Sequence, residues 1–315
     1  MRAVTIRSTD LVIEERAAPE PGPYDVVVDV RAAGLNAADL HQRAGFYPAP
    51  PGSPEDIPGM ELAGVVSEVG DRVVELLLGR RVCALVGGGA QATQCVVPAE
   101  HLLFLPSHVD FDQAGGFPEA FSTAYDALVT QADLRARERV LISGAAGGVG
   151  VAGVQIARVL GAEVIAVTRT NEHHEQLRAL GADETVTLDE VPSLGGVDVV
   201  LELVGAAHLS LAFSVLNAHA RVIIIGVGSG SHVEIDLLKL MQRRTVLTGS
   251  TMRSRSKKEK AEVARLVGDT LIPRWRTGEF VVPLAKVFAL DEAAAAYEYF
   301  AQPGKFGKVV LSVDR

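Results

Sequence analysis

The chain has 315 residues, a formal net charge of -9 at pH 7, 48% hydrophobic residues and 22% charged residues. This composition is typical of folded globular proteins and excludes a wholly disordered chain, and the length suits about two domains. The excess of acidic residues argues against binding of a nucleic-acid backbone as the main task, and two cysteines (Cys83 and Cys95) cannot supply a disulfide framework or a four-thiolate zinc site.

The N-terminal segment is charged and contains no apolar run, so we expect no signal peptide. The longest stretch without a charge, residues 140–157, is nominally long enough to cross a membrane, but it contains five glycines. A buried strand, a turn and a helix start explain this stretch better. We therefore expect a cytoplasmic protein without a membrane segment.

Short strands are predicted in the first hundred residues. Alternating or β-branched segments bounded by turn residues occur at Val26–Val30, Gly64–Gly70, Arg81–Val86 and Thr93–Val97. Between them, residues 44–54 contain four prolines, which favour a stiff surface loop of the kind that often borders a binding site.

Strands and helices alternate from about residue 120, which is typical of a doubly wound parallel sheet. The predicted strands are Val140–Ser143, Glu163–Val167, Val197–Leu201, Arg221–Ile225 and Thr245–Leu247. The predicted helices are Val149–Leu160, Glu172–Leu180, Ala207–Leu216 and Leu237–Arg243. A helix over Lys257–Leu271 and short strands at Phe280–Val282 and Lys308–Ser312 then return the chain to the first domain. We predict an α/β protein with a discontinuous domain (1–118 and 257–315) around a central domain (119–256).

A glycine-rich turn follows the first strand of the central domain and opens a helix. Its sequence places Ala145, Gly147 and Gly150 at the three small-residue positions of a dinucleotide-binding turn. The middle glycine lets the backbone approach a pyrophosphate, and the helix N-terminus offers unpaired N–H groups. The strand–turn–helix–strand context favours cofactor binding over a mere packing turn. The candidate contacts in this turn are Ala145, Gly147, Gly148, Val149 and Gly150.

The second strand of this domain ends at Thr168 and Arg169, and neither residue is the acid that usually holds the ribose 2′-hydroxyl of NAD. A guanidinium can instead hold a 2′-phosphate through paired hydrogen bonds. The alternative is a solvated arginine at a helix start, and Glu172 slightly weakens the phosphate interpretation. The missing carboxylate favours NADPH.

The lysines exclude two other chemistries. All seven lie in the last quarter of the chain, beginning at Lys239, so the glycine turn cannot be a Walker-type phosphate loop. No tyrosine is followed four positions later by a lysine, which excludes a Tyr-x-x-x-Lys catalytic pair.

Four motifs carry a family resemblance that covers nearly the whole chain. They are GLNAAD at 34–39, PGMELAG at 58–64, AAGGVG at 145–150 and GKVVL at 307–311. With these motifs the chain resembles the zinc-free quinone oxidoreductases of the medium-chain dehydrogenase/reductase family. Residues 45–52, 117–120 and 253–256 resemble the stress-inducible, ζ-crystallin-like members. The resemblance implies a mostly β GroES-like catalytic domain, a Rossmann domain for NADPH, a homodimer and a small-molecule quinone or enone substrate.

The resemblance also bears on metal binding. The zinc alcohol dehydrogenases of this family have a cysteine where Asn36 stands and a histidine where Met60 stands, and neither an amide nor a thioether competes with those ligands for Zn²⁺. Their second, four-cysteine zinc lobe is missing as well. We therefore expect no metal, and hydride transfer to an acceptor that is already electrophilic.

The expected catalytic residues are Asn36, Asp39 and Tyr47. Asn36 and Asp39 resemble the pair beside the nicotinamide, although a helix cap would also use these residue types. Tyr47 could donate its phenol hydrogen bond to a carbonyl or could anchor the proline-rich loop. Glu61 is expected to be a structural remnant, hydrogen-bonded inside its domain.

The resemblance assigns further cofactor contacts outside the glycine turn. They are Thr123, Gly205, Gly226, Val227 and Lys308. Thr123 could instead be a helix-start hydroxyl, and Lys308 could lie on a solvated strand. The basic run Arg253–Lys260 is interpreted as a solvated helix start. Two departures from the pattern of the proteins that the chain resembles, Gly147 in place of a serine and Leu188 in place of the family's tyrosine, bear on turnover.

Two other functions remain open. One is reduction of 2-alkenals or enones at carbon. The other is a binding protein, either a crystallin-like protein that sequesters NADPH or a secondary RNA binder.

Overall fold

The computed structural model describes residues 1–313 and divides into two compact units. The first unit contains Met1–Ser122 and the chain from Met252 onward, and the second contains Thr123–Thr251. The boundaries expected from the sequence lay after residues 118 and 256. Among the described residues, none of the helices is both long enough and apolar enough to span a membrane.

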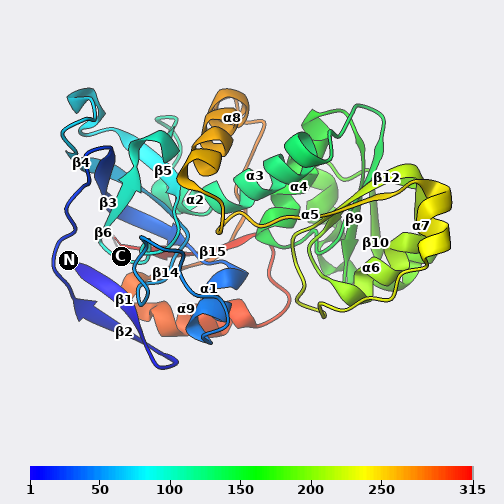
Figure 1. Cartoon of the computed structure of the whole chain (residues 1–315), viewed down its shortest axis with the longest axis horizontal. Helices are drawn as coiled ribbons and strands as arrows, with labels where there is room; N and C mark the ends of the chain where they lie inside the picture. Colours follow the sequence, from blue (N-terminus) through cyan, green and yellow to red (C-terminus); the bar gives the residue numbers. More distant parts are fainter. Residues whose placement is uncertain (314–315) are drawn as a thin grey trace. The chain divides into compact units, whose positions relative to one another are not determined.

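The first unit is built on a mixed β-sheet with strand order β14-β15-β3-β4-β5-β7, and β6 pairs with β3 off this path (Figure 1). A separate hairpin is formed by β1 and β2. The strands are β1 (Arg2–Arg7), β2 (Asp10–Glu15), β3 (Asp25–Gly34), β4 (Glu61–Val69), β5 (Arg81–Leu85), β6 (Gln94–Pro98), β7 (Leu102–Phe104), β14 (Leu284–Ala289) and β15 (Lys308–Ser312). The helices are α1 (Ala37–Arg43), α2 (Phe111–Gly115), α8 (Lys257–Arg276) and α9 (Ala293–Ala301), and α3 (Pro118–Tyr125) crosses into the second unit.

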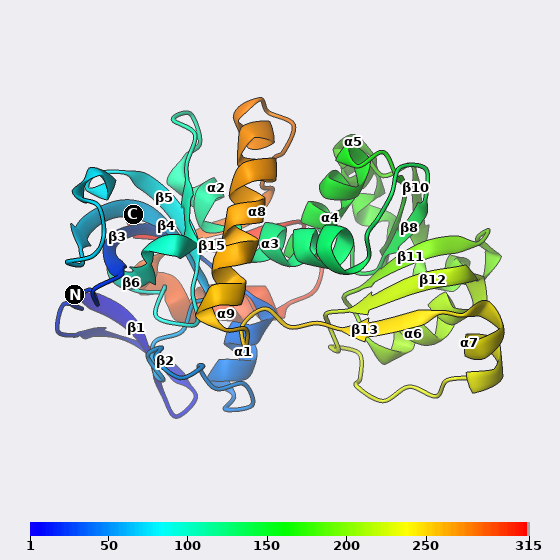
Figure 2. The same cartoon turned by 45° about the horizontal axis from the view of Figure 1, so that its top comes forward.

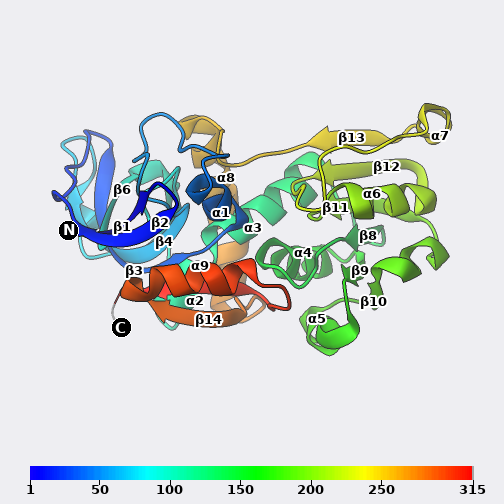
Figure 3. The same cartoon turned by 90° about the horizontal axis from the view of Figure 1, so that it is seen from below.

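The returning strand β15 decides where the C-terminal residues lie. It pairs antiparallel with β3, with Val310 opposite Gly34, because its valines and leucine are buried on the sheet. This pairing brings the start of β15 beside the end of β3, although the two segments are far apart in the sequence. Helix α9 covers β14 and β15 (Figure 3), with Tyr297 fully buried against them.

The second unit contains a parallel sheet with strand order β10-β9-β8-β11-β12-β13. Figure 2 shows β8, β11, β12 and β13 side by side in that order. The strands are β8 (Arg139–Ile142), β9 (Glu163–Thr168), β10 (Glu184–Thr187), β11 (Val197–Glu202), β12 (Leu216–Ile224) and β13 (Val246–Gly249). The helices are α4 (Gly148–Val159), α5 (His174–Leu180), α6 (Ala206–Ala212) and α7 (Leu237–Arg243). This order is that of a doubly wound sheet, as the α/β alternation predicts.

Several elements differ from the sequence-based expectation. Helix α6 ends at Ala212, and β12 begins at Leu216, which was expected to end that helix. Residues 280–282 form no strand, and β14 begins only at Leu284, after Pro283, which has no N–H to donate to a sheet. Phe280 and Val282 are buried as single side chains, so their hydrophobicity reflects packing rather than strand pairing. Helix α8 continues to Arg276, beyond the predicted end at Leu271.

Candidate functional site

A buried polar cluster lies where β3, β4 and β15 meet in the first unit. Asn36 follows the end of β3, Glu61 opens β4 and Lys308 opens β15. The Lys308 ammonium is 2.6 Å from the side-chain oxygen of Asn36 and 2.6 Å from a carboxylate oxygen of Glu61, and it also donates to the backbone oxygen of Leu35. The Asn36 amide donates to the same Glu61 oxygen at 2.8 Å. All donors of the ammonium are therefore used inside this cluster.

The structure decides two sequence-based alternatives. Lys308 is 3% exposed, so it does not lie on a solvated strand. Asn36 is the N-cap of α1 and forms a capping box with Asp39, so the cap alternative holds, while its side chain also bonds to Glu61 and Lys308. Glu61 is hydrogen-bonded inside the unit, as expected, and its second oxygen accepts the backbone N–H of Glu119 at 2.8 Å.

Asp39 is fully buried on α1, one turn of helix after Asn36. Its two carboxylate oxygens accept the backbone N–H groups of Asn36 (2.8 Å) and Gly59 (3.1 Å). Burial raises the pKa of the Asp39 carboxyl to about 6, against the opposing effects of those hydrogen bonds and of the positive charges of Arg253 and Lys308. Asp39 therefore changes charge in the mildly acidic range.

Arg253 holds the proline-rich loop and was missed by the sequence analysis, which interpreted residues 253–260 as a solvated helix start. That interpretation is wrong for two of these residues, because Arg253 is 2% exposed and Lys260 is 8% exposed. The Arg253 guanidinium donates to the backbone oxygen of Tyr47 at 3.1 Å and to Gln42 at 2.6 Å. It also lies 5.1 Å from the centre of the Tyr47 ring. No sequence signal distinguishes this arginine from its exposed neighbours.

The sequence led us to expect no metal ion, and the donor atoms at the two candidate ligand positions bear on this expectation. Within residues 1–313, no group of three or more His, Cys, Asp and Glu side chains is arranged to hold a metal ion. Asn36 and the buried Met60 stand at the two ligand positions identified from the family resemblance, and the ammonium of Lys308 lies against Asn36. A cation next to a weak amide donor does not fit Zn²⁺.

The glycine turn of the second unit joins β8 to α4. Gly147 is the N-cap of α4, and its lack of a side chain leaves the first N–H groups of the helix without a side-chain acceptor. A Cβ atom at Gly150 would lie 2.5 Å from the backbone oxygen of Gly144, whereas one at Gly147 would meet only that oxygen, at 3.4 Å. Gly150 is therefore required for packing, and Gly147 leaves open space at the helix N-terminus, which suits an anionic ligand.

A buried carboxylate behind this turn was also missed. Glu202, at the end of β11, accepts the hydroxyl of Ser143 at 2.8 Å and bonds to Nδ1 of His208 on α6. It also accepts the backbone N–H groups of Val204 and Gly205. Burial would raise the pKa of the Glu202 carboxyl, but the bonds from His208 and these N–H groups outweigh it and leave the pKa below its ordinary value. A charged residue ending an apolar strand is the signal that could have identified it.

The predicted ribose-side residues follow β9. Thr168 is 8% exposed, and its hydroxyl bonds to the backbone oxygen of Thr170 and to His174. Arg169 is exposed, and the described part of the chain gives it no hydrogen bond or ion pair. Its guanidinium is therefore available to a ligand.

The remaining predicted cofactor residues lie in the second unit. Thr123 is buried in the second half of α3, not at a helix start. Gly205 has a φ of 109° at the start of α6, a conformation that favours glycine. A Cβ atom at Gly226 would lie 2.2 Å from the backbone oxygen of Leu203, and Val227 is 53% exposed. Gly205 and Gly226 thus follow adjacent strands of the sheet, β11 and β12.

Comparison with known proteins gives matches over most of the chain. Residues 22–107 match the alcohol dehydrogenase GroES-like domain, and residues 148–268 match the zinc-binding dehydrogenase domain. The quinone oxidoreductase of Lama guanicoe is 32% identical over 308 residues, which cover 94% of this chain and 91% of that protein.

Solved structures match the whole fold. The quinone oxidoreductase from Thermus thermophilus, solved alone and with NADPH, is 34% identical with a TM-score of 0.85, covering 99% of this chain and 100% of that one. A cobalt- and zinc-bound alcohol dehydrogenase from Pyrobaculum aerophilum is 29% identical with a TM-score of 0.87, covering 99% of each chain.

Proposed function

Because the chain belongs to the quinone oxidoreductase branch of the medium-chain dehydrogenase/reductase family, we propose that it is an NADPH-dependent reductase that transfers hydride to quinones without a metal ion. One observation carries the metal-free part of this proposal. The ammonium of Lys308 lies against Asn36 and Glu61, so that a protein cation occupies the polar cluster at the ligand position identified from the resemblance.

The second unit supplies the cofactor-binding residues. The bare N-terminus of α4 at Gly147 offers N–H groups to the pyrophosphate, and Arg169 offers a free guanidinium to the 2′-phosphate. Glu202 holds Gly205 and the end of β8 in place through its hydrogen bonds. When bound, NADPH supplies the hydride. Thr123, Gly226 and Val227 complete the proposed set of contacts in this unit.

The first unit supplies the residues proposed to orient the reacting groups. Asn36 is fixed by Glu61 and Lys308, which leaves it a single orientation from which to hold the nicotinamide end or the acceptor oxygen. Lys308 would act on the nicotinamide end of the cofactor indirectly, by holding Asn36 in position. Tyr47 would donate its phenol hydrogen bond to the carbonyl that gains negative charge, because its loop is tied down by Arg253. Asp39 orients the backbone of Asn36.

A zinc-dependent alcohol oxidation is not proposed. Asn36 and Met60 supply weak donors, and the ammonium of Lys308 would repel a divalent cation. A quinone is electrophilic enough to accept hydride without a Lewis acid, so its orientation and the exclusion of water are sufficient tasks for the protein.

The proposal is tested by NADPH oxidation with a panel of ortho-quinones, para-quinones, 2-alkenals and cyclic enones. We expect turnover with quinones and formation of the hydroquinone. Faster turnover of 2-alkenals, with a saturated aldehyde as product, would favour the enone reductase instead. Tight NADPH binding without turnover of any acceptor would favour the binding protein.

We also propose a homodimer formed through β13. This strand pairs with β12 on one side, and it is the last strand of its sheet within the described residues. Exposed apolar side chains surround it, namely Val246 on the strand and Leu237, Leu238 and Met241 on α7. Light scattering of wild type and of Val246→Asp would test this, since a charge in the interface should produce monomers.

A reducing, cytoplasmic environment is consistent with the cysteines. Cys83 and Cys95 are both buried and unpaired with each other. Burial raises the pKa of the Cys95 thiol to about 12, which makes it an inert thiol rather than a reactive one.

A further inference from the structure

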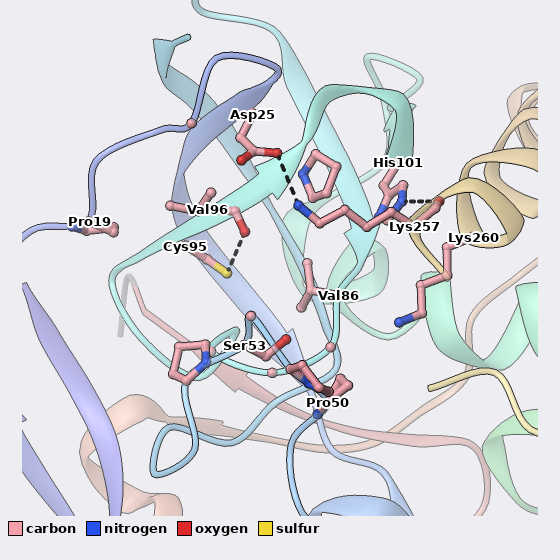
Figure 4. Close-up of a pocket in the computed structure, with 18 of the residues that line it drawn as sticks. Pro19, Asp25, Pro50, Ser53, Val86, Cys95, Val96, His101, Lys257 and Lys260 are labelled. Carbon is pink, nitrogen blue, oxygen red and sulfur yellow. Dashed lines mark hydrogen bonds and ion pairs between the residues drawn. The ribbon is translucent and has the colours of Figure 1, made fainter. Parts of the chain in front are cut away.

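A cavity of about 580 Å³ lies inside the first unit (Figure 4). Its walls come from residues 50–54, residues 86–89, strand β6 and the first turn of α8. A volume of this size suits a small molecule. The proposed catalytic residues Asn36, Asp39 and Tyr47 do not line it.

The wall of this cavity contains a buried cation. Lys260 points from α8 into the cavity (Figure 4) and is 8% exposed. Its ammonium donates one hydrogen bond, to the backbone oxygen of Arg253 at 2.7 Å. Within residues 1–313 no carboxylate lies within ion-pair distance of it. Two of its three N–H groups therefore lack a protein acceptor.

The surroundings of Lys260 add to its positive charge rather than balance it. Burial lowers the pKa of Lys260, and the nearby charge of Arg253 lowers it further. The guanidinium bonds described for Arg253 within residues 1–313 go to neutral oxygens, including the backbone oxygen of Gly87 at 2.9 Å in the cavity wall. The negative charge that acts on Arg253 is that of Asp39, which does not line the cavity. A buried cation without a counterion is strongly unfavourable, so an anion in the cavity would stabilise this arrangement.

Two other titratable groups of the wall, those of Lys257 and His101, are already balanced or neutral. Lys257 is 77% exposed at the rim and lies 4.0 Å from the carboxylate of Asp25. Burial lowers the pKa of His101, and its Nε2 lies 2.9 Å from the backbone oxygen of Lys257. The lining also includes Glu20, whose side chain is exposed, and the half-buried Arg255, together with the apolar Val86 and the uncharged Ser53.

We propose that this cavity binds a small organic carboxylate, with its charged end on Lys260 and its apolar body against Val86 and the proline-rich loop. The ammonium is a compact point charge, which suits a ligand with one carboxylate group. Because Lys260 bonds to Arg253, and Arg253 bonds to Tyr47, an occupied cavity would also hold the Tyr47 loop more firmly.

Benzoate is a suitable probe, and its uncharged amide is the matched control ligand. In calorimetric titrations of the full chain at pH 7, we expect benzoate to bind at least tenfold more tightly than benzamide. Lys260→Met should weaken benzoate at least tenfold and leave benzamide within twofold. The matched variant Lys257→Met, at the rim of the same cavity, should leave both ligands within twofold.

Several outcomes would overturn the proposal. They are no benzoate binding at 10 mM, equal binding of benzoate and benzamide, or an equal loss of benzoate affinity in both lysine variants.

Thermal unfolding gives a second, independent measurement. Without ligand, Lys260→Met should unfold at the same or a higher temperature than wild type, and benzoate should raise the unfolding temperature of wild type only. A variant that unfolds at a clearly lower temperature would contradict the unfavourable burial of the Lys260 charge on which the proposal rests. None of these measurements depends on reductase activity.

Discussion

The ammonium of Lys308 lies 2.6 Å from the side-chain oxygen of Asn36, although the two residues are 272 positions apart in the chain. The contact exists because β15 pairs with the end of β3. The contact also links β15 to Asn36, the residue proposed to orient the reacting groups. Glu61 bonds to both Asn36 and Lys308.

Lys308→Met should therefore destabilise the protein and disorder Asn36. The substitution leaves the carboxylate of Glu61 buried without its cation, which typically costs about 3–5 kcal/mol. Urea unfolding measures this change. The control is Lys286→Met, which removes an exposed lysine of the neighbouring β14 and should change the unfolding free energy by less than about 1 kcal/mol. Similar effects of both variants would contradict the role assigned to the buried contact.

Asp39 should make stability depend on pH. Its carboxyl has a pKa of 3.8 in the unfolded chain and about 6 in the folded protein, so the folded protein binds the proton more tightly. The contribution of Asp39 to the free energy of unfolding should therefore fall by about 3 kcal/mol as the pH rises from about 4 to 6, and it stays lost above pH 6. The difference in unfolding free energy between wild type and Asp39→Asn should shift by that amount over this range. A difference that is constant from pH 4 to 7 would show that burial does not raise this pKa.

Two glycines of the cofactor turn should respond differently to the same change. Gly150→Ala places a methyl group 2.5 Å from the backbone oxygen of Gly144 and should cost about 1–3 kcal/mol through overpacking. Gly147→Ala places it 3.4 Å from that oxygen, in an extended conformation open to any residue, and should change stability by less than about 1 kcal/mol. Thermal unfolding of both variants decides this, and the reverse order would be inconsistent with the packing described for α4.

Arg253→Gln should loosen the proline-rich loop. The substitution removes the bond to the backbone oxygen of Tyr47 and the contact with its ring. Chymotrypsin should then cleave after Phe46, which is already 82% exposed, at least about tenfold faster. Arg81→Gln is the matched control, because Arg81 likewise bonds to loop carbonyls and lies over an aromatic ring, that of Phe111. Equal acceleration in both variants would indicate a general loss of stability instead.

Arg169→Glu should weaken NADPH far more than NADH. A hydrogen bond between charged groups contributes about 1.5–3 kcal/mol, so we expect a loss of about tenfold or more for NADPH. Fluorescence titration with both nucleotides measures the ratio. Arg178→Glu, an exposed arginine on α5, controls for the change in net charge. If Arg169→Glu lowered both affinities equally, the role at the 2′-phosphate would be wrong.

Local patterns predicted most of the elements that carry the cofactor turn. The strand before residue 145 and the helix after it are encoded by neighbouring residues, and so is the alternation that builds the parallel sheet. The family motifs predicted the GroES-like and Rossmann architecture. The segment 280–282 was misassigned because buried apolar side chains also occur where a chain packs without pairing.

Contacts between distant segments could not be predicted in the same way. Arg253 looks like its exposed neighbours in the sequence, and only the fold brings it to Tyr47 and Gln42. Lys308 was expected near the cofactor, yet its bonds to Asn36 and Glu61 depend on the pairing of β15 with β3. Burial of a charge is a property of the tertiary structure, and a single sequence does not reveal it.

The most direct test of the central claim is NADPH oxidation by protein that has been treated with a chelator. The protein would be dialysed against 1,10-phenanthroline and then assayed with 9,10-phenanthrenequinone, with NADPH and NADH compared at equal concentration. We predict unchanged turnover after chelation, one NADPH consumed per hydroquinone formed, and a kcat/KM at least about tenfold higher for NADPH than for NADH. Loss of turnover on chelation that added Zn²⁺ restores, or the absence of quinone reduction while NADPH binds, would contradict the account.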